Sequence, residues 1–585
     1  MNSISEEMKA PTTRITQLFM TLKQTNRPDI FSTQRCQRDQ INHLTEKGVF
    51  LCFQRFRGQL GHAVQVLLCV FGPSLAAAAT PDKPHFPIRQ FVIQGNLKIS
   101  SHTLESVVAP LTGDDRDFAT IQAAVAAIQL AYKEAGYETI RVVIPKQEID
   151  NGIVRLQVFE AVLGKVQLEG NKFFDDSNIR HALPSLKEGQ TPDIRALGVN
   201  LRLVNESSAK QTQVTFLKGD DPQAVDAKVE VVDGSPWRAA ASLDNTGTDA
   251  TGDWRLGFAY MHSNLFNRDH VISAQYVTSP EHIENVNIFG LNYRIPLYTL
   301  GDALEFNASH SDVNSGVINT TAGSYGISGS GDNLGGHYIY LLPRVMGWDQ
   351  RINVGFDFRR YQNNVTLQGG DGSSLVPDTQ VNVLSASYIG FIRQPEREWA
   401  VNFGVYQNMP GGSKGDSLAL EAARTGANAS YTLMRYSVNF NQNLPENWQL
   451  RAEFSGQHTN DALISGEQFG LGGINSVRGF QERILANDKG HRASLELFTP
   501  DLAALLEKNS VKLRAVAFYN AANAWRNNPL PDEEDHNHIS SIGLGLRGSV
   551  GQHAHLRLDL ANILDTGDVS SEGQKLAQAS VFCLF

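Results

Sequence analysis

The sequence predicts a transmembrane β-barrel of about 16 antiparallel strands that follows two small α+β domains. Two observations predict this fold class. Residues 88–234 show one order of strand and helix patterns twice, and residues 237–585 consist of short segments in which apolar and polar residues alternate. The predicted parts are an N-terminal extension and signal segment (1–79), two α+β domains (88–161 and 162–234) and the barrel (237–585).

Length and composition restrict the classes of protein that the chain can belong to. A chain of 585 residues is too long for one compact core. The formal net charge of −10 argues against nucleic acid as the main partner. No pair among the four cysteines, Cys36, Cys52, Cys69 and Cys583, has the spacing of metal ligands. No catalytic Ser/His/Asp pattern stands out either, so we expect no enzyme activity, no metal and no cofactor.

The start of the chain has the order of a secretory signal. Arg55 and Arg57 precede an apolar run over residues 63–71, which ends at Pro73 and a series of small residues up to Ala79. The alternative is a short buried helix. Residues 1–54 are mixed polar sequence without clear periodicity, and their role stays open.

The repeat over residues 88–234 predicts two copies of one β-α-α-β-β unit. Each copy begins with a strand that ends in a Gly-Asn turn, Gly95-Asn96 in the first and Gly170-Asn171 in the second, 75 residues further on. Helical spacing of apolar residues follows each turn, and two strand-like segments close each copy. Such a unit packs its helices on one sheet face and leaves a strand edge free. An unfolded client could add a strand to that edge, although the units could also be mere spacers. In element order and turn, both units resemble polypeptide-transport-associated (POTRA) domains.

From Trp237 onward the pattern changes to alternation typical of a barrel. In the segment over residues 254–261, Trp254, Leu256, Phe258 and Tyr260 share one face. A long open sheet would expose its edges, and in lipid no water can pair them, so we expect the sheet to close. The final residues alternate in the same way, with Val581 and Phe585 on the apolar face, and resemble the recognition signal for barrel insertion in bacterial outer membranes. A soluble β-sandwich repeat is the alternative.

A glycine-rich stretch at residues 470–480 contains one arginine, Arg478, within Val477-Arg478-Gly479-Phe480. Five strand-like segments follow it, which places the stretch in the outer connection between strands 11 and 12 of a 16-strand barrel. Such a loop can fold back into the lumen, where a buried guanidinium needs an acceptor. Strand alternation turns Glu496 and Asn520 inward, so both are candidate acceptors for Arg478.

The set Val477–Phe480 resembles the loop-tip motif of two-partner secretion transporters. Asp244–Gly247 and Asn264–Asp269 at the barrel start are similar to that family too, and the resemblance covers residues 88–585. It implies that the loop-tip arginine pairs with an aspartate on the inner wall. Here Asn520 stands at that position, so we expect Glu496 to supply the charge and to share Arg478 with Asn520. Family members often carry a plug helix before the first POTRA unit, and residues 80–87 are too few for one.

The resemblance implies a pore in the bacterial outer membrane, with POTRA units in the periplasm. The expected partners are a large secreted exoprotein, which docks through its N-terminal secretion region, outer-membrane lipid and lipopolysaccharide, and the barrel-assembly machinery that inserts the chain. Two alternatives remain open, namely a barrel-assembly factor of the same superfamily and a passive porin or uptake channel. The client could be an adhesin, a toxin or a heme-acquisition protein.

Overall fold

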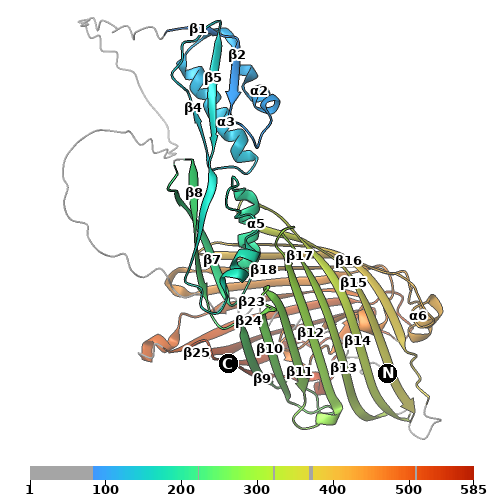
Figure 1. The fold of residues 1–585 in the computed structure, drawn as a ribbon. Helices are drawn as coiled ribbons and strands as arrows, with labels where there is room; N and C mark the ends of the chain where they lie inside the picture. Colours follow the sequence, from blue (N-terminus) through green and yellow to red (C-terminus); the bar gives the residue numbers. More distant parts are fainter. Residues whose placement is uncertain (1–83, 222, 321–322, 368–372, 507–509, 532) are drawn as a thin grey trace, which may run out of the picture.

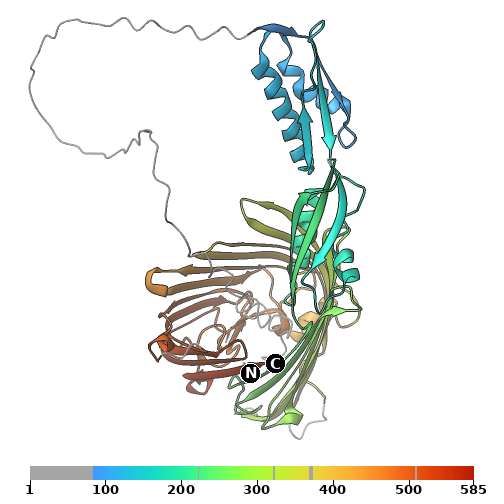
Figure 2. The ribbon, with the colours of Figure 1, turned by 60° about the vertical axis from the view of Figure 1, so that its left-hand side comes forward.

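The computed structural model describes residues 84–585 except 222, 321–322, 368–372, 507–509 and 532. The predicted extension and signal segment lie outside the described residues, and so do residues 80–83 of the stretch considered for a plug helix. Two small units stand in line at one end of a barrel, and the second unit is the one next to the barrel (Figures 1 and 2). Within the described ranges, no helix is long and apolar enough to cross a membrane.

The first unit packs two helices on one face of a three-stranded sheet in the order β2-β5-β4, with β2 parallel to β5. Alternate residues of the strands and one face of each helix form its buried core, because a strand repeats every two residues and a helix every 3.6. A two-stranded sheet of β1 and β3 is an addition that the sequence pattern did not predict. The elements are β1 (Phe86–Ile88), β2 (Gln90–Gln94), α2 (Ser101–Val108), β3 (Gly113–Arg116), α3 (Phe118–Glu134), β4 (Ile140–Val143) and β5 (Ile153–Glu160).

The second unit repeats this plan with a sheet in the order β6-β8-β7 and β6 parallel to β8. One residue, Ala161, separates the last strand of the first unit from the first strand of the second. The elements are β6 (Val162–Glu169), α4 (Asp176–Ala182), α5 (Ile194–Val204), β7 (Lys210–Lys218) and β8 (Ala224–Asp233).

The two Gly-Asn turns are built alike. Gly95 and Gly170 both have positive φ, +79° and +89°, and a Cβ at either would lie 2.4 Å or less from a neighbouring atom. Asn96 Nδ2 donates to the backbone oxygen of Ile99, and Asn171 Nδ2 donates to that of Phe174. A carboxylate at the end of the last strand of each unit then accepts backbone N–H groups of the turn, Glu160 in the first unit and Asp233 in the second. The turns therefore fix where β2 ends and α2 begins in the first unit, and where β6 ends and α4 begins in the second.

The barrel is closed by 16 antiparallel strands, which confirms the predicted fold class. The last strand, β28, pairs with β26 on one side and with the first strand, β9, on the other. The strands are β9 (Trp237–Asp244), β10 (Arg255–Leu265), β11 (His270–Thr278), β12 (Val286–Leu297), β13 (Asp302–Thr320), β14 (Gly323–Val345), β15 (Trp348–Leu367), β16 (Thr379–Arg393), β17 (Arg397–Asn408), β18 (Thr432–Asn443), β19 (Gln449–His458), β23 (Lys489–Phe498), β24 (Val511–Trp525), β25 (His536–Val550), β26 (Ala554–Asp565) and β28 (Ala577–Leu584).

Alternation along the strands separates an apolar exterior from a polar interior. On β26, Leu556, Leu558 and Leu560 are exposed on the outer face, while Asp559 between them is buried. Exposed aromatic and aliphatic side chains recur on the outer faces of the other strands, such as Phe258 on β10 and Leu544 on β25. An outer surface of this kind is suited to lipid, whereas inward charges need partners inside the lumen.

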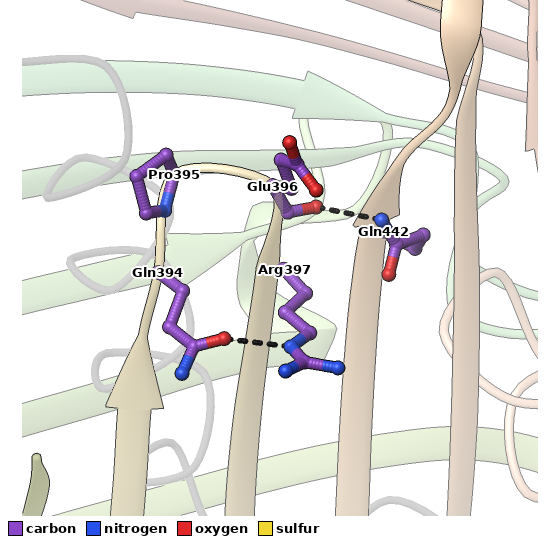
Figure 3. Close-up of a pocket in the computed structure, with 5 residues that line it drawn as sticks. All are labelled: Gln394, Pro395, Glu396, Arg397 and Gln442. Atoms are coloured by element: carbon purple, nitrogen blue, oxygen red, sulfur yellow. Dashed lines mark hydrogen bonds between the residues drawn. The ribbon is translucent and has the colours of Figure 1, made fainter. Parts of the chain in front are cut away.

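The barrel end that carries the second unit is called the proximal end, and the opposite end the distal end. The proximal connections are mostly short. In the turn between β16 and β17, Arg397 Nε donates to Gln394 Oε1 at 2.6 Å, and Gln442 Nε2 donates to the backbone oxygen of Glu396 (Figure 3). These polar residues line a small pocket that contains none of the predicted site residues. Longer distal connections join β17 to β18, with α6 (Ser417–Ala423), and β19 to β23.

The second unit is joined to the proximal end by a shared hydrophobic cluster. Tyr298, Ala303, Ile339 and Leu341 of the barrel belong to the same buried cluster as the core of the unit. Asn200 Nδ2 in α5 donates to the backbone oxygen of Tyr298 at 2.7 Å. The unit and the barrel are thus packed as one body at this contact.

A buried ion pair lies in the same contact. Lys210 Nζ on β7 donates to both carboxylate oxygens of Asp269 at 2.8 Å. Asp269 sits in the turn between β10 and β11 and also accepts from Tyr298 Oη and Asn178 Nδ2. Burial lowers the pKa of Lys210, and the Asp269 charge opposes that shift. The stretch Asn264–Asp269, known from the sequence only for its family resemblance, therefore supplies the surface on which the second unit rests.

Candidate functional site

The distal connection between β19 and β23 folds back into the barrel. This segment, residues 459–488, is called the lumenal hairpin. Its two arms pair through β20 (Phe469–Leu471) and β22 (Leu485–Asn487). Near its tip, β21 (Gly479–Phe480) pairs with β27 (Gln574–Lys575), which belongs to the connection between β26 and β28. The predicted position between the eleventh and twelfth strands matches the observed strand order.

Glycine at position 479 allows the hairpin to lie against the inner wall. Its φ of +95° is one that other residues adopt with strain. A Cβ there would lie 3.0 Å from the Cβ of Ala561 and 3.2 Å from Ile563, both on β26. The backbone around Arg478 can therefore approach the wall closely enough for a side chain to bind across it.

Arg478 lies inside the lumen and is only 2% exposed. Its Nε donates to Asn520 Oδ1 at 2.8 Å, and its Nη1 donates to Glu496 Oε1 at 2.7 Å. The guanidinium carbon lies 3.5 Å from the ring centroid of Phe518, in the arrangement of a cation–π contact. Glu496 is on β23, and Phe518 and Asn520 are on β24. The structure thus brings together Arg478 and the two wall residues considered for it.

A third wall residue, Asp559 on β26, was not among the predicted partners. Its Oδ1 lies 3.7 Å from Arg478 Nη1, and it also pairs with Arg547 Nη2 at 2.8 Å and Arg557 Nε at 2.7 Å. The signal that could have found it is the run of leucines at 556, 558 and 560, which turns Asp559 inward. Arg478 therefore faces two carboxylates and one amide.

The apolar neighbours of Arg478 fasten the hairpin tip as well. Val477 and Phe480 are fully buried in a cluster with Leu471, Ala522, Ala524 and Ile539. Gln578 Nε2 on β28 donates to the backbone oxygen of Phe480 at 3.1 Å. Residues from β24, β25 and β28 thus meet the tip, so its position depends on how the barrel closes.

The remaining candidate residues lie elsewhere. Val581 on β28 and Phe585, directly after that strand, are both exposed, and the backbone of Phe585 pairs with Ala239 of β9 at the closing seam. Gly95 and Asn96 lie between β2 and α2 of the first unit, and Gly170 and Asn171 lie between β6 and α4 of the second. The structure therefore does not bring these residues together with Arg478.

The chain forms a closed barrel with an apolar exterior, has two β-α-α-β-β units at one end, and holds a hairpin in the lumen. Together these features define an outer-membrane transporter of the POTRA-barrel class. Residues 224–548 match the family model of the haemolysin secretion/activation protein ShlB/FhaC/HecB, and residues 86–161 match the ShlB-type POTRA domain. The chain belongs to the haemolysin secretion/activation protein family, and the resemblance seen in the sequence is confirmed. The proximal end therefore faces the periplasm and the distal end faces the outside.

Named relatives agree with this family, and a solved structure agrees with the fold. The outer membrane transporter CdiB of Dickeya dadantii is 21% identical over 74% of this chain and 75% of that protein. The heme/hemopexin transporter protein HuxB of Haemophilus influenzae is 20% identical, with 82% of this chain and 84% of HuxB covered. The structure of CdiB from Escherichia coli superposes with a TM-score of 0.69 at 18% identity, over 88% of this chain and 93% of that one.

Proposed function

We propose that this transporter exports one large partner exoprotein from the periplasm to the cell surface, and that the lumenal hairpin held by Arg478 is the gate of its pore. The observation that carries the proposal is the buried guanidinium between Asn520, Glu496 and Asp559. The hairpin occupies space through which a chain would have to pass, and its contacts with the wall, polar and apolar alike, are non-covalent and therefore reversible. Relatives named as a hemolysin transporter, HpmB of Proteus mirabilis, and a heme/hemopexin transporter, HuxB, support a secreted protein as the cargo.

The first POTRA unit offers a surface for an unfolded client. Its sheet ends in the edge strand β4, and a pocket beside this strand is lined by Val125, Val142 and Ile144 among others. An extended peptide that adds to β4 would bond through its backbone and place side chains in this apolar pocket. We infer that the client's N-terminal secretion region docks here before it enters the barrel.

Two further partners belong to the proposal. The exposed residues Val581, on β28, and Phe585, directly after it, would serve as the signal that the barrel-assembly machinery reads when it inserts the chain. The apolar outer faces of the strands would contact outer-membrane lipid and lipopolysaccharide. No nucleotide is needed for this scheme, because folding of the client outside the cell can supply direction.

The decisive experiment is deletion of residues 88–161, which we assign to the first POTRA domain, followed by measurement of client export and of barrel insertion. We expect export of one surface protein to be lost while the barrel still inserts, as judged by its heat-dependent migration. Normal export would contradict the docking role. General loss of outer-membrane proteins would favour a barrel-assembly factor, and unchanged conductance with no export phenotype would favour a passive channel.

A further inference from the structure

The base of the lumenal hairpin carries buried carboxylates, opposite in sign to Arg478, and one of them, Glu467, binds residues of the barrel wall. Glu467 is only 1% exposed and lies in the arm that precedes β20. Arg359 Nη1 donates to its two carboxylate oxygens at 2.9 and 3.0 Å, and Tyr361 Oη donates to Oε1 at 2.7 Å. Arg435 Nη2 approaches Oε2 at 3.4 Å. This carboxylate therefore meets two guanidinium groups and one phenol.

The partners of Glu467 belong to a different arc of the wall from those of Arg478. Arg359 and Tyr361 are on β15 and Arg435 is on β18, whereas the tip contacts β23, β24 and β26. The polarity is reversed as well. At the tip the hairpin supplies the cation and the wall supplies carboxylates; at the base the hairpin supplies the carboxylate and the wall supplies cations.

Close packing accompanies the ion pairs at the base. A Cβ on Gly466 would lie 2.5 Å from the ring of Tyr361, and the Tyr361 hydroxyl also donates to the Gly466 backbone oxygen at 3.3 Å. Leu463 and Ile464 of the same arm are buried against Tyr361, Val381 and Val383 of the wall. The base is thus seated on β15 and β16 independently of Arg478.

We propose that Glu467 is a second latch of the gate, so that the pore opens fully only when both Glu467 and Arg478 leave the wall. The proposal rests on the hairpin being the gate. A hairpin released at the tip alone stays tethered at its base and still obstructs the lumen. A buried charge that loses its partners is costly, so Glu467 at the base and Arg478 at the tip each stabilise the closed state.

A double-mutant cycle tests this inference. We would reconstitute full-length wild-type protein, E467Q, R478Q and E467Q/R478Q in planar bilayers and measure the open fraction of the channel. Each single change should raise the open fraction, and the double change should exceed either single change by roughly tenfold or more. E467D should behave nearly as wild type, because it keeps the charge.

Two controls separate a latch from a folding residue. D302N removes a carboxylate that is also buried, and its partners, Tyr338 and the backbone of Leu341, are wall residues outside the hairpin. It should leave the open fraction unchanged. R359Q removes the same contact from the wall side. It therefore tests the inference even where E467Q fails to migrate as a folded barrel. The open fraction of R359Q/R478Q should equal that of E467Q/R478Q.

The outcomes distinguish the latch from the gate. If R478Q opens the channel but neither E467Q nor R359Q raises the open fraction further, Glu467 is not a second latch, while the proposal that the hairpin is the gate is retained. If neither R478Q nor the double variants change the open fraction, the hairpin is not the gate and both ideas fall.

Discussion

Arg478 donates through Nε to the amide oxygen of Asn520 at 2.8 Å, while the charge on its guanidinium is balanced elsewhere, by Glu496 at 2.7 Å. Asn520, at the position where the family resemblance implies a charged acceptor, therefore orients the guanidinium. Glu496 on the neighbouring strand balances its charge. A bond to a neutral amide is weaker than one to a carboxylate, which makes the contribution of each partner measurable.

The E496Q change should weaken the closed gate. It leaves Arg478 with an amide in place of its nearest carboxylate and with Asp559 at 3.7 Å. Removing one partner of a buried pair costs about 3 kcal/mol, so the open fraction of the channel should rise strongly. Bilayer conductance measures the effect. A variant that opens no more than wild type would show that Asp559 alone holds the charge.

The N520D change should have the opposite effect. A carboxylate at this position would convert the 2.8 Å bond from Arg478 Nε into a charge-assisted one, and the ion-paired closed state should become more stable. We expect a lower open fraction and slower client export than in wild type. N520L, which removes the acceptor and keeps the branched shape of the side chain, is the matched comparison and should open the channel. Equal conductance of the two variants would contradict this reasoning.

Loss of the Lys210 charge should loosen the second unit from the barrel. In K210M, Asp269 keeps donors from Tyr298 and Asn178 but loses its cation within the buried contact. We expect a destabilisation of about 3 kcal/mol at this contact, seen as faster proteolysis between residues 234 and 237 in the folded protein. Lys165, paired with Asp220 on the surface of the same unit, provides the control, since K165M should change cleavage little.

The turn glycine of the second unit should not tolerate a side chain. In G170A the new Cβ would lie 2.4 Å from the backbone oxygen of Val231, at a φ of +89°. The strain should cost about 1–3 kcal/mol and raise hydrogen exchange in β6 and β8. Gly198, within α5 of the same unit, has open space at its Cβ position. G198A should slightly lower hydrogen exchange in the unit, because alanine favours a helix. Equal hydrogen exchange in G170A and G198A would contradict the structural role of the turn.

Several parts of this protein were determined by the sequence alone. The alternation of apolar and polar residues predicted the barrel, because side chains along a strand point to opposite faces whatever the neighbours are. The same periodicity turned Glu496 and Asn520 inward, and the 75-residue repeat predicted two units of one plan. Glycines at 95, 170 and 479 marked turns and a close approach, since these conformations exclude most side chains.

Only the tertiary structure decided which inward charges meet. Asp559 is far along the chain from Arg478, and Glu467 is far along the chain from Arg359. Strand alternation says only that a residue faces the lumen, not what stands opposite to it. The seat of the second unit on Asp269 likewise depends on how β7 reaches the turn between β10 and β11. These contacts follow from barrel closure and from the path of the hairpin. Barrel closure and the path of the hairpin both depend on contacts between distant parts of the chain, because buried charges need partners that no local pattern specifies.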